Sequence, residues 1–172
     1  MRTGGAGRVV VAAVGSPFRR DDAAGPAVLD RVVAELGGVD VLGALASPWH
    51  LLGAWDGADL AIVVDAVAAG DEPGTVHVVE VDTAFSVAER GGAAPRTSSH
   101  GVGVIEALHI AVALGTAPAR VVLVGVAGED FGPGTGLTPS ASRAVERAAR
   151  VVGELAGVAP ARTPEGDGAR RT

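Results

Sequence analysis

The sequence predicts an α/β fold, a three-layer α/β/α sandwich around a mostly parallel sheet. Short β-branched runs alternate along the chain with segments of helical periodicity. Most of these runs are apolar throughout, as expected of strands that are buried on both faces. The length of 172 residues and the apolar content of 48% suit one domain with a sizeable core. Strands that alternate with helices imply parallel pairing, with helices covering both sheet faces.

The first half of the chain predicts three strands and one long helix. Residues 8–14, RVVVAAV, form a short β-branched run that Gly15 ends, which is typical of a buried strand. A helix is expected over residues 22–36, because apolar side chains recur there at helical spacing and Gly37 then ends the pattern. The elements expected next are a strand over 39–42, a short helix over 48–55 and a strand over 60–67.

The second half predicts an edge strand followed by helix, strand and helix. Residues 75–81, TVHVVEV, alternate between apolar and polar more clearly than the other runs, which indicates an exposed face or an edge position. The elements expected next are a helix over 100–114, a buried strand over 120–126 and an amphipathic helix over 140–155. From Ala159 onward Pro, Gly, Arg and Thr dominate. We therefore expect one domain over residues 1–158 and a frayed tail over 159–172.

Composition excludes several classes of function. The chain has no cysteine, which removes disulfides, thiolate metal ligands and a cysteine nucleophile. Its net charge of -6 argues against nucleic acid or an anionic membrane as a partner. No apolar run reaches the roughly 20 residues of a membrane span, and residues 1–8 are too few and too rich in glycine for us to expect a signal peptide. We expect a cytoplasmic protein, and a monomer because no long apolar helix face is left over.

Three polar motifs interrupt apolar surroundings where strands end or helices begin. They are VGSPFRRDD at residues 14–22, VVDA at 63–66 and SSHG at 98–101. In parallel α/β sheets the carboxyl ends of strands and the N-termini of the following helices share one edge, where ligands bind. Asp22, Asp65 and His100 are therefore all expected at that edge.

These three residues suit a divalent metal, although each also has a simpler interpretation. Two carboxylates and a neutral imidazole form a mixed oxygen and nitrogen set with open coordination positions. A helix N-terminus disfavours imidazolium, so His100 would be a neutral ligand there. Asp22 could instead cap its helix, and His100 could be a solvated residue at a helix start. Asp65 is harder to explain, because a carboxylate that ends an apolar strand loses hydration. Asp21 cannot face the same pocket as Asp22 and is expected to support it from behind.

Two other enzyme classes have weaker support. Gly15 before a helix N-terminus could cradle a phosphate, but the chain has neither G-x-G-x-x-G nor G-x-x-x-x-G-K. Ser16 does not lie in a G-x-S-x-G elbow, which argues against a serine hydrolase.

The run GSPFRRDDAAGP at residues 15–26 resembles the opening motif of the hydrogenase maturation endopeptidases. These are nickel-dependent proteases that trim the C-terminus of a [NiFe]-hydrogenase large-subunit precursor. Further similar motifs follow in the family's order, namely VVDAV, PGTV, SSHGVGVIEAL, VVLVGV and GLTPS. The resemblance spans residues 8–155, and the ordered series carries it rather than any single motif.

The resemblance implies both a fold and a site. The fold would be a three-layer sandwich of the phosphorylase/hydrolase type. Asp22, Asp65 and His100 would contact nickel, which the substrate precursor supplies and already holds through cysteine thiolates, with other divalent metals as substitutes. The protein would be an endopeptidase that removes the C-terminal extension after nickel insertion, by metal-assisted hydrolysis. Its partner would be the large-subunit precursor.

Two departures from the family pattern keep alternatives open. Ser16 stands where Asn is usual, and residues 43–48, GALASP, replace a Gly-Gly-Thr-x-Gly segment that helps to position the substrate. His50 follows that segment and could approach the site, whereas His77 and His109 are expected outside it. One alternative is a non-catalytic maturation chaperone that senses the nickel site. The other is a phosphate- or nucleoside-binding α/β enzyme.

Overall fold

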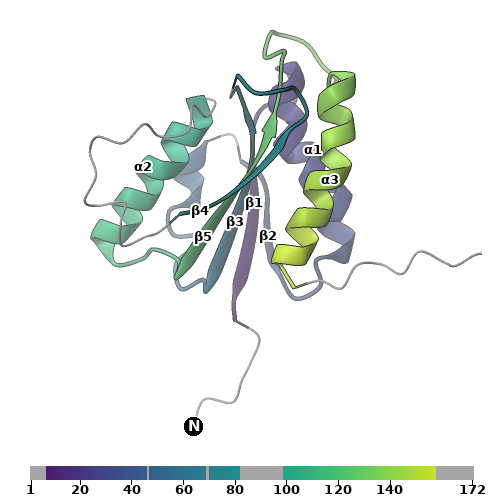
Figure 1. Ribbon diagram of the computed structural model, residues 1–172. Helices are drawn as coiled ribbons and strands as arrows, with labels where there is room; N and C mark the ends of the chain where they lie inside the picture. The colour runs from purple at the N-terminus through teal and green to yellow at the C-terminus, as the bar shows by residue number, and fades with distance from the viewer. Residues whose placement is uncertain (1–6, 46, 69, 82–98, 158–172) are drawn as a thin grey trace, which may run out of the picture.

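The computed structural model describes residues 7–45, 47–68, 70–81 and 99–157, with only the backbone for 99–102 (Figure 1). The expected tail and the polar stretch before the second long helix lie outside these ranges. The strands are β1 Val9–Val14, β2 Asp40–Leu45, β3 Leu60–Val67, β4 Val76–Val81 and β5 Arg120–Ala127. The helices are α1 Ala24–Val32, α2 Ser99–Leu114 and α3 Pro139–Leu155, with the 3-10 turns η1 Arg20–Ala23, η2 Val33–Glu35 and η3 Pro48–Leu51.

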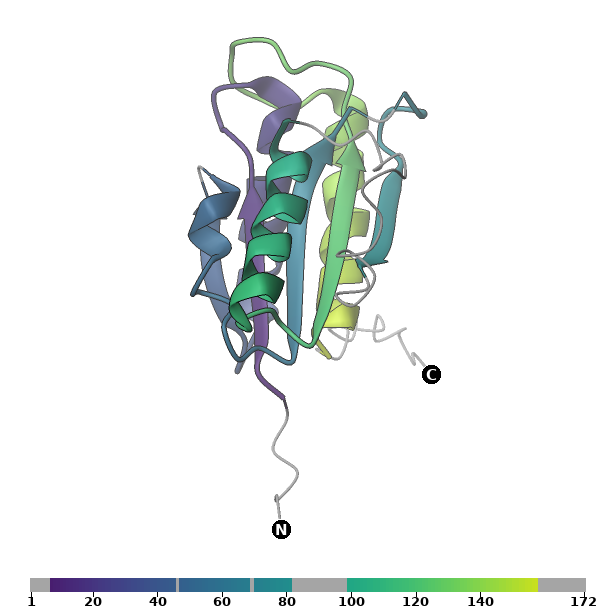
Figure 2. The ribbon, with the colours of Figure 1, turned by 90° about the vertical axis from the view of Figure 1, so that its left-hand side faces the viewer.

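The sheet confirms the predicted, mostly parallel α/β architecture. Its strand order is β2-β1-β3-β5-β4. The pairs β1·β2, β1·β3 and β3·β5 are parallel, whereas β4 pairs antiparallel with β5 at one edge. The alternating run over residues 75–81 is thus an edge strand, as its pattern predicts. Because the other four strands run the same way, β1, β3 and β5 all end at one edge of the sheet (Figure 2).

Helices cover both faces of the sheet and separate two halves of the core. α1 and α3 pack on one face, and α2 with η3 packs on the other (Figure 1). Along β3 the side chains alternate between these halves, so Ile62 and Val64 join the α1 and α3 side and Val63 joins the α2 side. The same alternation places Asp65 on the α2 side.

In the described ranges the helices lie on the outside of the domain and pack against the sheet. α1 and α3 lie side by side, and Arg31 and Glu146 form an ion pair between them. The buried face of α3 consists largely of alanine and valine, which allows close helix packing. Within these ranges, no helix has both the length and the apolar character that a membrane span requires.

The helix expected over residues 22–36 is three shorter pieces in the structure. η1 comes first, then α1, and η2 ends the run. Arg20 opens the first piece with a positive φ of 47°, which the apolar periodicity does not reveal. Asp22 therefore lies in the turn before α1, and neither η1 nor α1 has a side-chain N-cap. Asp22 is therefore not the N-cap residue of α1, which is Ala23.

Strand β2 is longer than the sequence predicts. It continues from Leu42 through Leu45, although the glycine at position 43 was expected to begin a loop. The register with β1 slips by one residue, because Val11 pairs with Val41 and Ala13 with Ala44. Gly43 has a φ of 76°, which fits a β-bulge that keeps the strand paired. Half of the segment that departs from the family pattern is therefore strand.

Gly25 sets how closely the start of α1 approaches the sheet. A Cβ at this position would lie 2.6 Å from the carbonyl oxygen of Val14 and 2.8 Å from that of Val64. These distances are shorter than any relaxed contact between carbon and oxygen. The first turn of α1 therefore rests directly on the backbones of β1 and β3, and η1 is held at their carboxyl ends.

We predict that Gly25→Ala destabilises the protein by about 1–2 kcal/mol, because overpacking against two carbonyl groups outweighs the gain in helix propensity. Gly153→Ala in α3 is the matched control, since its Cβ would meet only Val32 Cγ2 at 3.8 Å. That variant is expected to be as stable as the parent or more stable by up to about 1 kcal/mol. Urea unfolding measures both, and equal stabilities would contradict the close approach.

Candidate functional site

The predicted site residues belong to segments that meet at the carboxyl edge of the sheet. Asp22 lies in η1 just after β1, and η1 packs against β3, which carries Asp65 near its end. His100 lies in the first turn of α2, but its side chain lies outside the described residues. Among the side chains that are described, no three histidine or acidic groups converge as a metal site. That Asp22, Asp65 and His100 act together stays a prediction.

The carboxylate of Asp22 is buried and held by the loop that precedes it. Asp22 is 2% exposed, and the backbone N–H of Ser16 donates to its Oδ2 at 2.9 Å. Gly15 permits this closure, because it has a φ of 139° and a Cβ there would lie 2.0 Å from the carbonyl oxygen of Asp22. The hydroxyl of Ser16 accepts instead from the N–H of Phe18 at 3.3 Å. Since a backbone group of residue 16 orients Asp22, the change from Asn to Ser preserves this contact.

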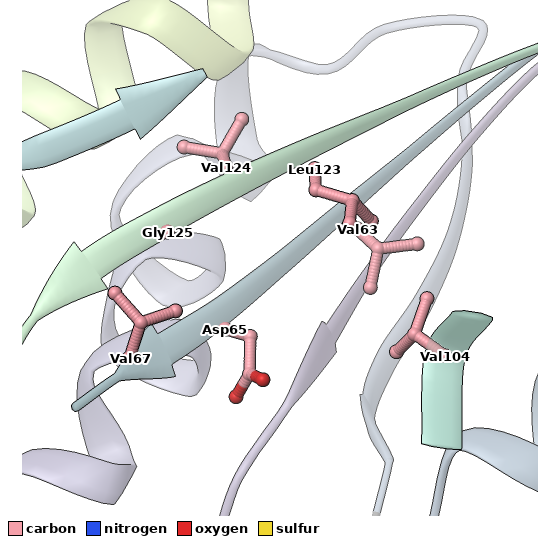
Figure 3. Close-up of a pocket in the computed structure, with 7 residues that line it drawn as sticks. All are labelled: Val63, Asp65, Val67, Val104, Leu123, Val124 and Gly125. Atoms are coloured by element: carbon pink, nitrogen blue, oxygen red, sulfur yellow. The ribbon is translucent and has the colours of Figure 1, made fainter. Parts of the chain in front are cut away.

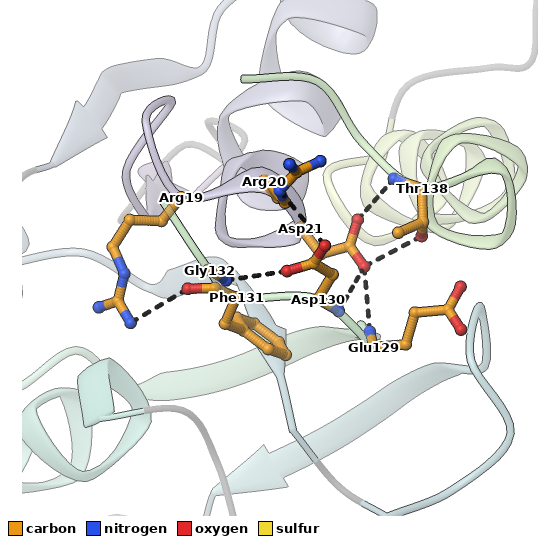
Figure 4. A network of polar contacts seen from close by, with 8 residues as sticks. All are labelled: Arg19, Arg20, Asp21, Glu129, Asp130, Phe131, Gly132 and Thr138. Carbon is orange, nitrogen blue, oxygen red and sulfur yellow. Dashed lines mark hydrogen bonds and ion pairs between the residues drawn. The ribbon is translucent and has the colours of Figure 1, made fainter. Parts of the chain in front are cut away.

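The carboxylate of Asp21 points into a network with the loop between β5 and α3 (Figure 4). It is fully buried. Its Oδ2 accepts from the N–H groups of Glu129 at 3.0 Å and Asp130 at 3.2 Å. The N–H of Thr138 donates to Oδ1 at 2.7 Å, and the Thr138 hydroxyl donates to Oδ2 at 3.0 Å. Four hydrogen bonds thus join η1 to a loop that lies more than a hundred residues later.

These hydrogen bonds determine the charge state of Asp21. Burial acts to raise the pKa of its carboxyl, but the backbone N–H groups of Glu129, Thr138 and Asp130, together with the Thr138 hydroxyl, lower it. The donors prevail, and the pKa of Asp21 is held below its usual value. Asp21 is therefore a buried anion at neutral pH whose hydration is replaced by protein donors.

Thr138 connects this network to helix α3. Its hydroxyl accepts from the N–H of Ala141 at 3.4 Å as the N-cap of α3, while the same group donates to Asp21. Gly128 packs closely against Asp21, since a Cβ at position 128 would lie 2.8 Å from Cβ of Asp21. No local sequence pattern indicates this link, although Thr138 belongs to the GLTPS motif at residues 136–140.

The two loops also bind each other along their backbones. The N–H of Arg20 donates to the carbonyl of Gly134 at 3.1 Å, and the N–H of Gly134 donates to that of Phe18 at 2.9 Å. Nε of Arg20 lies 3.3 Å from Oδ2 of Asp130. Arg20 therefore helps to hold the loop over residues 129–138 against the loop that carries Asp22, and the guanidinium of Arg19 donates to the carbonyl of Phe131 at 3.3 Å.

Asp65 lies in the wall of a small pocket on the α2 side of the sheet (Figure 3). It is 7% exposed and pairs in register with Gly125 of β5. The other side chains of the wall include Val63 and Val67 from β3 and Val104 from α2. Val104 comes one helical turn after His100, so the first turns of α2 lie beside Asp65.

The remaining histidines occupy other positions. His50 lies exposed in η3, and His109 lies exposed on α2. Nε2 of His77 lies 3.0 Å from Oδ2 of Asp71. Residue 77 pairs with Gly125, which places it two strands away from Asp65. The structure thus places the carboxylate of Asp71 beside His77.

Comparison with known proteins identifies the family. Residues 28–154 match the sequence model of HycI, hydrogenase maturation protease. The chain belongs to the hydrogenase maturation protease family. The matched range begins after Asp22, so it covers Asp65 and His100 but not the first loop. No curated protein sequence matches the chain significantly.

Solved structures of this family share the fold over most of the chain. The hydrogenase maturating endopeptidase HybD from E. coli is 25% identical with a TM-score of 0.70, over 86% of this chain and 91% of that one. The solution structure of an endopeptidase from Escherichia coli is 26% identical with a TM-score of 0.72, over 88% and 94%. The HybD protease from Thermococcus kodakarensis, at 24% identity and a TM-score of 0.68 over 87% and 99%, shares the fold.

We predict that Asp21→Asn destabilises the protein by about 2–3 kcal/mol at neutral pH, because an amide replaces a carboxylate that accepts four hydrogen bonds. The pKa of Asp21 is lower in the folded state than its usual 3.8. The Asp21 carboxylate therefore contributes fully to folding stability above pH 3.8, its usual pKa. This contribution is lost as the pH falls through the lower pKa of the folded state.

Urea unfolding of the parent and of Asp21→Asn across this acidic range measures the effect. The difference in unfolding free energy between the parent and Asp21→Asn should become smaller as the pH falls. Asp30→Asn, which alters an exposed carboxylate of α1, is the matched control and should change little. A difference that stays constant with pH would show that the Asp21 charge does not stabilise the fold.

Proposed function

We propose that the protein is the endopeptidase that removes the C-terminal extension of a [NiFe]-hydrogenase large-subunit precursor after nickel insertion. The observation that carries the proposal is the buried carboxylate of Asp22, held by the Ser16 N–H in a turn that packs on the strand of Asp65. Family membership supplies the reaction class, which is maturation of hydrogenase by proteolysis. The precursor is accordingly the proposed partner.

In this proposal the nickel is part of the substrate. Asp22, Asp65 and His100 contact it from η1, which follows β1, from β3 and from the start of α2. Carboxylate and imidazole ligands suit a borderline divalent ion. The protein reads the metal as the signal that the precursor is ready to be cut, and it needs no thiolate of its own.

Hydrolysis then requires a polarised carbonyl and a deprotonated water. Nickel in the precursor supplies the Lewis acid. One of the two carboxylates takes a proton from the attacking water as general base while the water oxygen bonds to the carbonyl carbon. The C–N bond then breaks as the leaving nitrogen gains that proton from the carboxyl group. The hydrogen bond from Ser16 keeps Asp22 oriented, and the Asp21 network fixes the turn in which both aspartates lie.

The first test is the intact mass of a nickel-loaded large-subunit precursor after incubation with the protein. We predict loss of a C-terminal peptide with the parent and no loss with Asp22→Asn or His100→Ala, because each removes a proposed nickel contact. His109→Ala is the matched control, since it removes an exposed histidine of the same helix, and it should retain cleavage. Circular dichroism checks that each variant folds.

Retained cleavage in Asp22→Asn or His100→Ala would remove that residue from the site. Complex formation without any change of mass, in the parent as well, would favour the alternative of a non-catalytic chaperone that senses the nickel site.

The second test concerns the metal. We predict that a precursor prepared without nickel is not cut, because no ion is then present to bring the carbonyl to Asp22 and Asp65. Addition of nickel to the same preparation should restore the mass change. Equal cleavage of the nickel-free precursor would overturn the metal-assisted mechanism while leaving a protease.

A further inference from the structure

Two large aromatic side chains lie exposed at the carboxyl edge of the sheet. Phe18 is 70% exposed and Trp49 is 46% exposed, although the chain has only three Phe, two Trp and no Tyr. Trp55, by contrast, is buried in the core. Aromatic side chains gain most from burial and are enriched where proteins bind one another. The proposed hydrolysis uses neither exposed ring, so both are available for binding.

The two aromatic residues follow neighbouring strands at the same end of the sheet. Val14, the last residue of β1, pairs in register with Leu45, the last residue of β2, and each aromatic residue comes four positions after its strand. Pro48, the residue before Trp49, packs on the first turns of α2, since a Cβ at Gly103 would lie 3.0 Å from Cγ of Pro48. The aromatic pair thus flanks the segments of the proposed site, one residue just before η1 and the other beside the start of α2.

The backbone around Phe18 is held on both sides. Its N–H donates to Oγ of Ser16 at 3.3 Å, and its carbonyl accepts from the N–H of Gly134 at 2.9 Å. The N–H of Arg19 donates to the carbonyl of Ser16 at 3.3 Å, and residue 19 forms a parallel bridge with Gly134. An aromatic ring on a backbone that is already ordered loses little conformational entropy when it binds a partner. Phe18 is therefore preorganised to act as an anchor.

Arg19 adds a positive charge beside Phe18. Its guanidinium donates to the carbonyl of Phe131 at 3.3 Å (Figure 4), whereas Arg20 pairs with the carboxylate of Asp130. In the part of the chain that the structure describes, no carboxylate forms an ion pair with Arg19. Aromatic and arginine side chains carry much of the binding energy at protein interfaces. The patch therefore fits a protein surface that offers apolar recesses next to a carboxylate.

We propose that Phe18, Arg19 and Trp49 form the surface that docks the folded precursor, against the part of its surface that surrounds the nickel. The inference rests on the proposed function, which brings that nickel to Asp22. A second copy of this chain on the patch would cover the carboxyl edge and close it to substrate, and two copies of net charge -6 repel each other. The precursor is therefore the occupant. The two rings enter apolar recesses of the precursor, and Arg19 pairs with a carboxylate at their rim.

The test measures the Kd for the nickel-free large-subunit precursor by isothermal titration calorimetry, because the proposed mechanism leaves this form uncut and docking is then separate from hydrolysis. Phe18→Ser and Trp49→Ser should each raise the Kd by about tenfold or more. Arg19→Gln should raise it less and should weaken its dependence on salt concentration. Leu114→Ser is the matched control, since Leu114 is 68% exposed at the far end of α2, and it should leave the Kd unchanged. Urea unfolding checks that the variants are as stable as the parent.

An unchanged Kd in the double variant Phe18→Ser and Trp49→Ser would overturn the docking surface, and so would a parent protein that does not bind the precursor. Sedimentation velocity tests the other occupant. A parent that dimerises and a double variant that is monomeric would show that the patch joins copies of this chain, which contradicts the proposal. The proposed function can fail separately. If the variants lose affinity while the parent leaves the mass of the nickel-loaded precursor unchanged, the docking surface is supported and the endopeptidase is rejected.

Discussion

The buried carboxylate of Asp21 is the interaction on which the carboxyl edge of this protein depends. Its donors are two residues that follow β5 and the residue that caps α3. A buried carboxylate without partners is costly, so the turn and the later loop are stable only together. Since Asp22 is the next residue, its position follows from that of Asp21. Two adjacent aspartates thus have different partners, since Asp21 accepts from the later loop and Asp22 from the N–H of Ser16.

Much of the fold follows from local sequence, because the buried strands are short β-branched runs with clear ends. β3 has the predicted bounds, and β1 and β5 differ from theirs by one residue. The helix over residues 22–36 was predicted too long, since apolar spacing over so few residues does not separate an α-helix from flanking 3-10 turns. β2 was predicted too short, because a glycine that ends many strands is here absorbed in a bulge at Gly43.

The site was predictable only to the extent that it follows from topology. The carboxyl ends of parallel strands lie at the same edge of a sheet. This rule alone predicts that Asp22 and Asp65 lie at the same end of the sheet. The partners of Asp21 could not be found in this way. They lie 108 to 117 residues later in the chain, and nothing in the local pattern of either segment specifies which loop faces which turn. The pocket at Gly125 depends likewise on register between strands.

The proposed mechanism, in which the metal arrives with the substrate, imposes a particular physical requirement. In an enzyme with a resident ion, the metal itself helps to hold its ligands in place, whereas here the proposed ligands must be positioned before the ion arrives. The Ser16 N–H, the Asp21 network and the direct packing of Gly25 on the sheet meet this requirement, since each restrains η1 without a metal. In the proposed mechanism, nickel binding would have less conformational entropy to overcome, and more of the interaction with nickel would be available to orient the scissile bond.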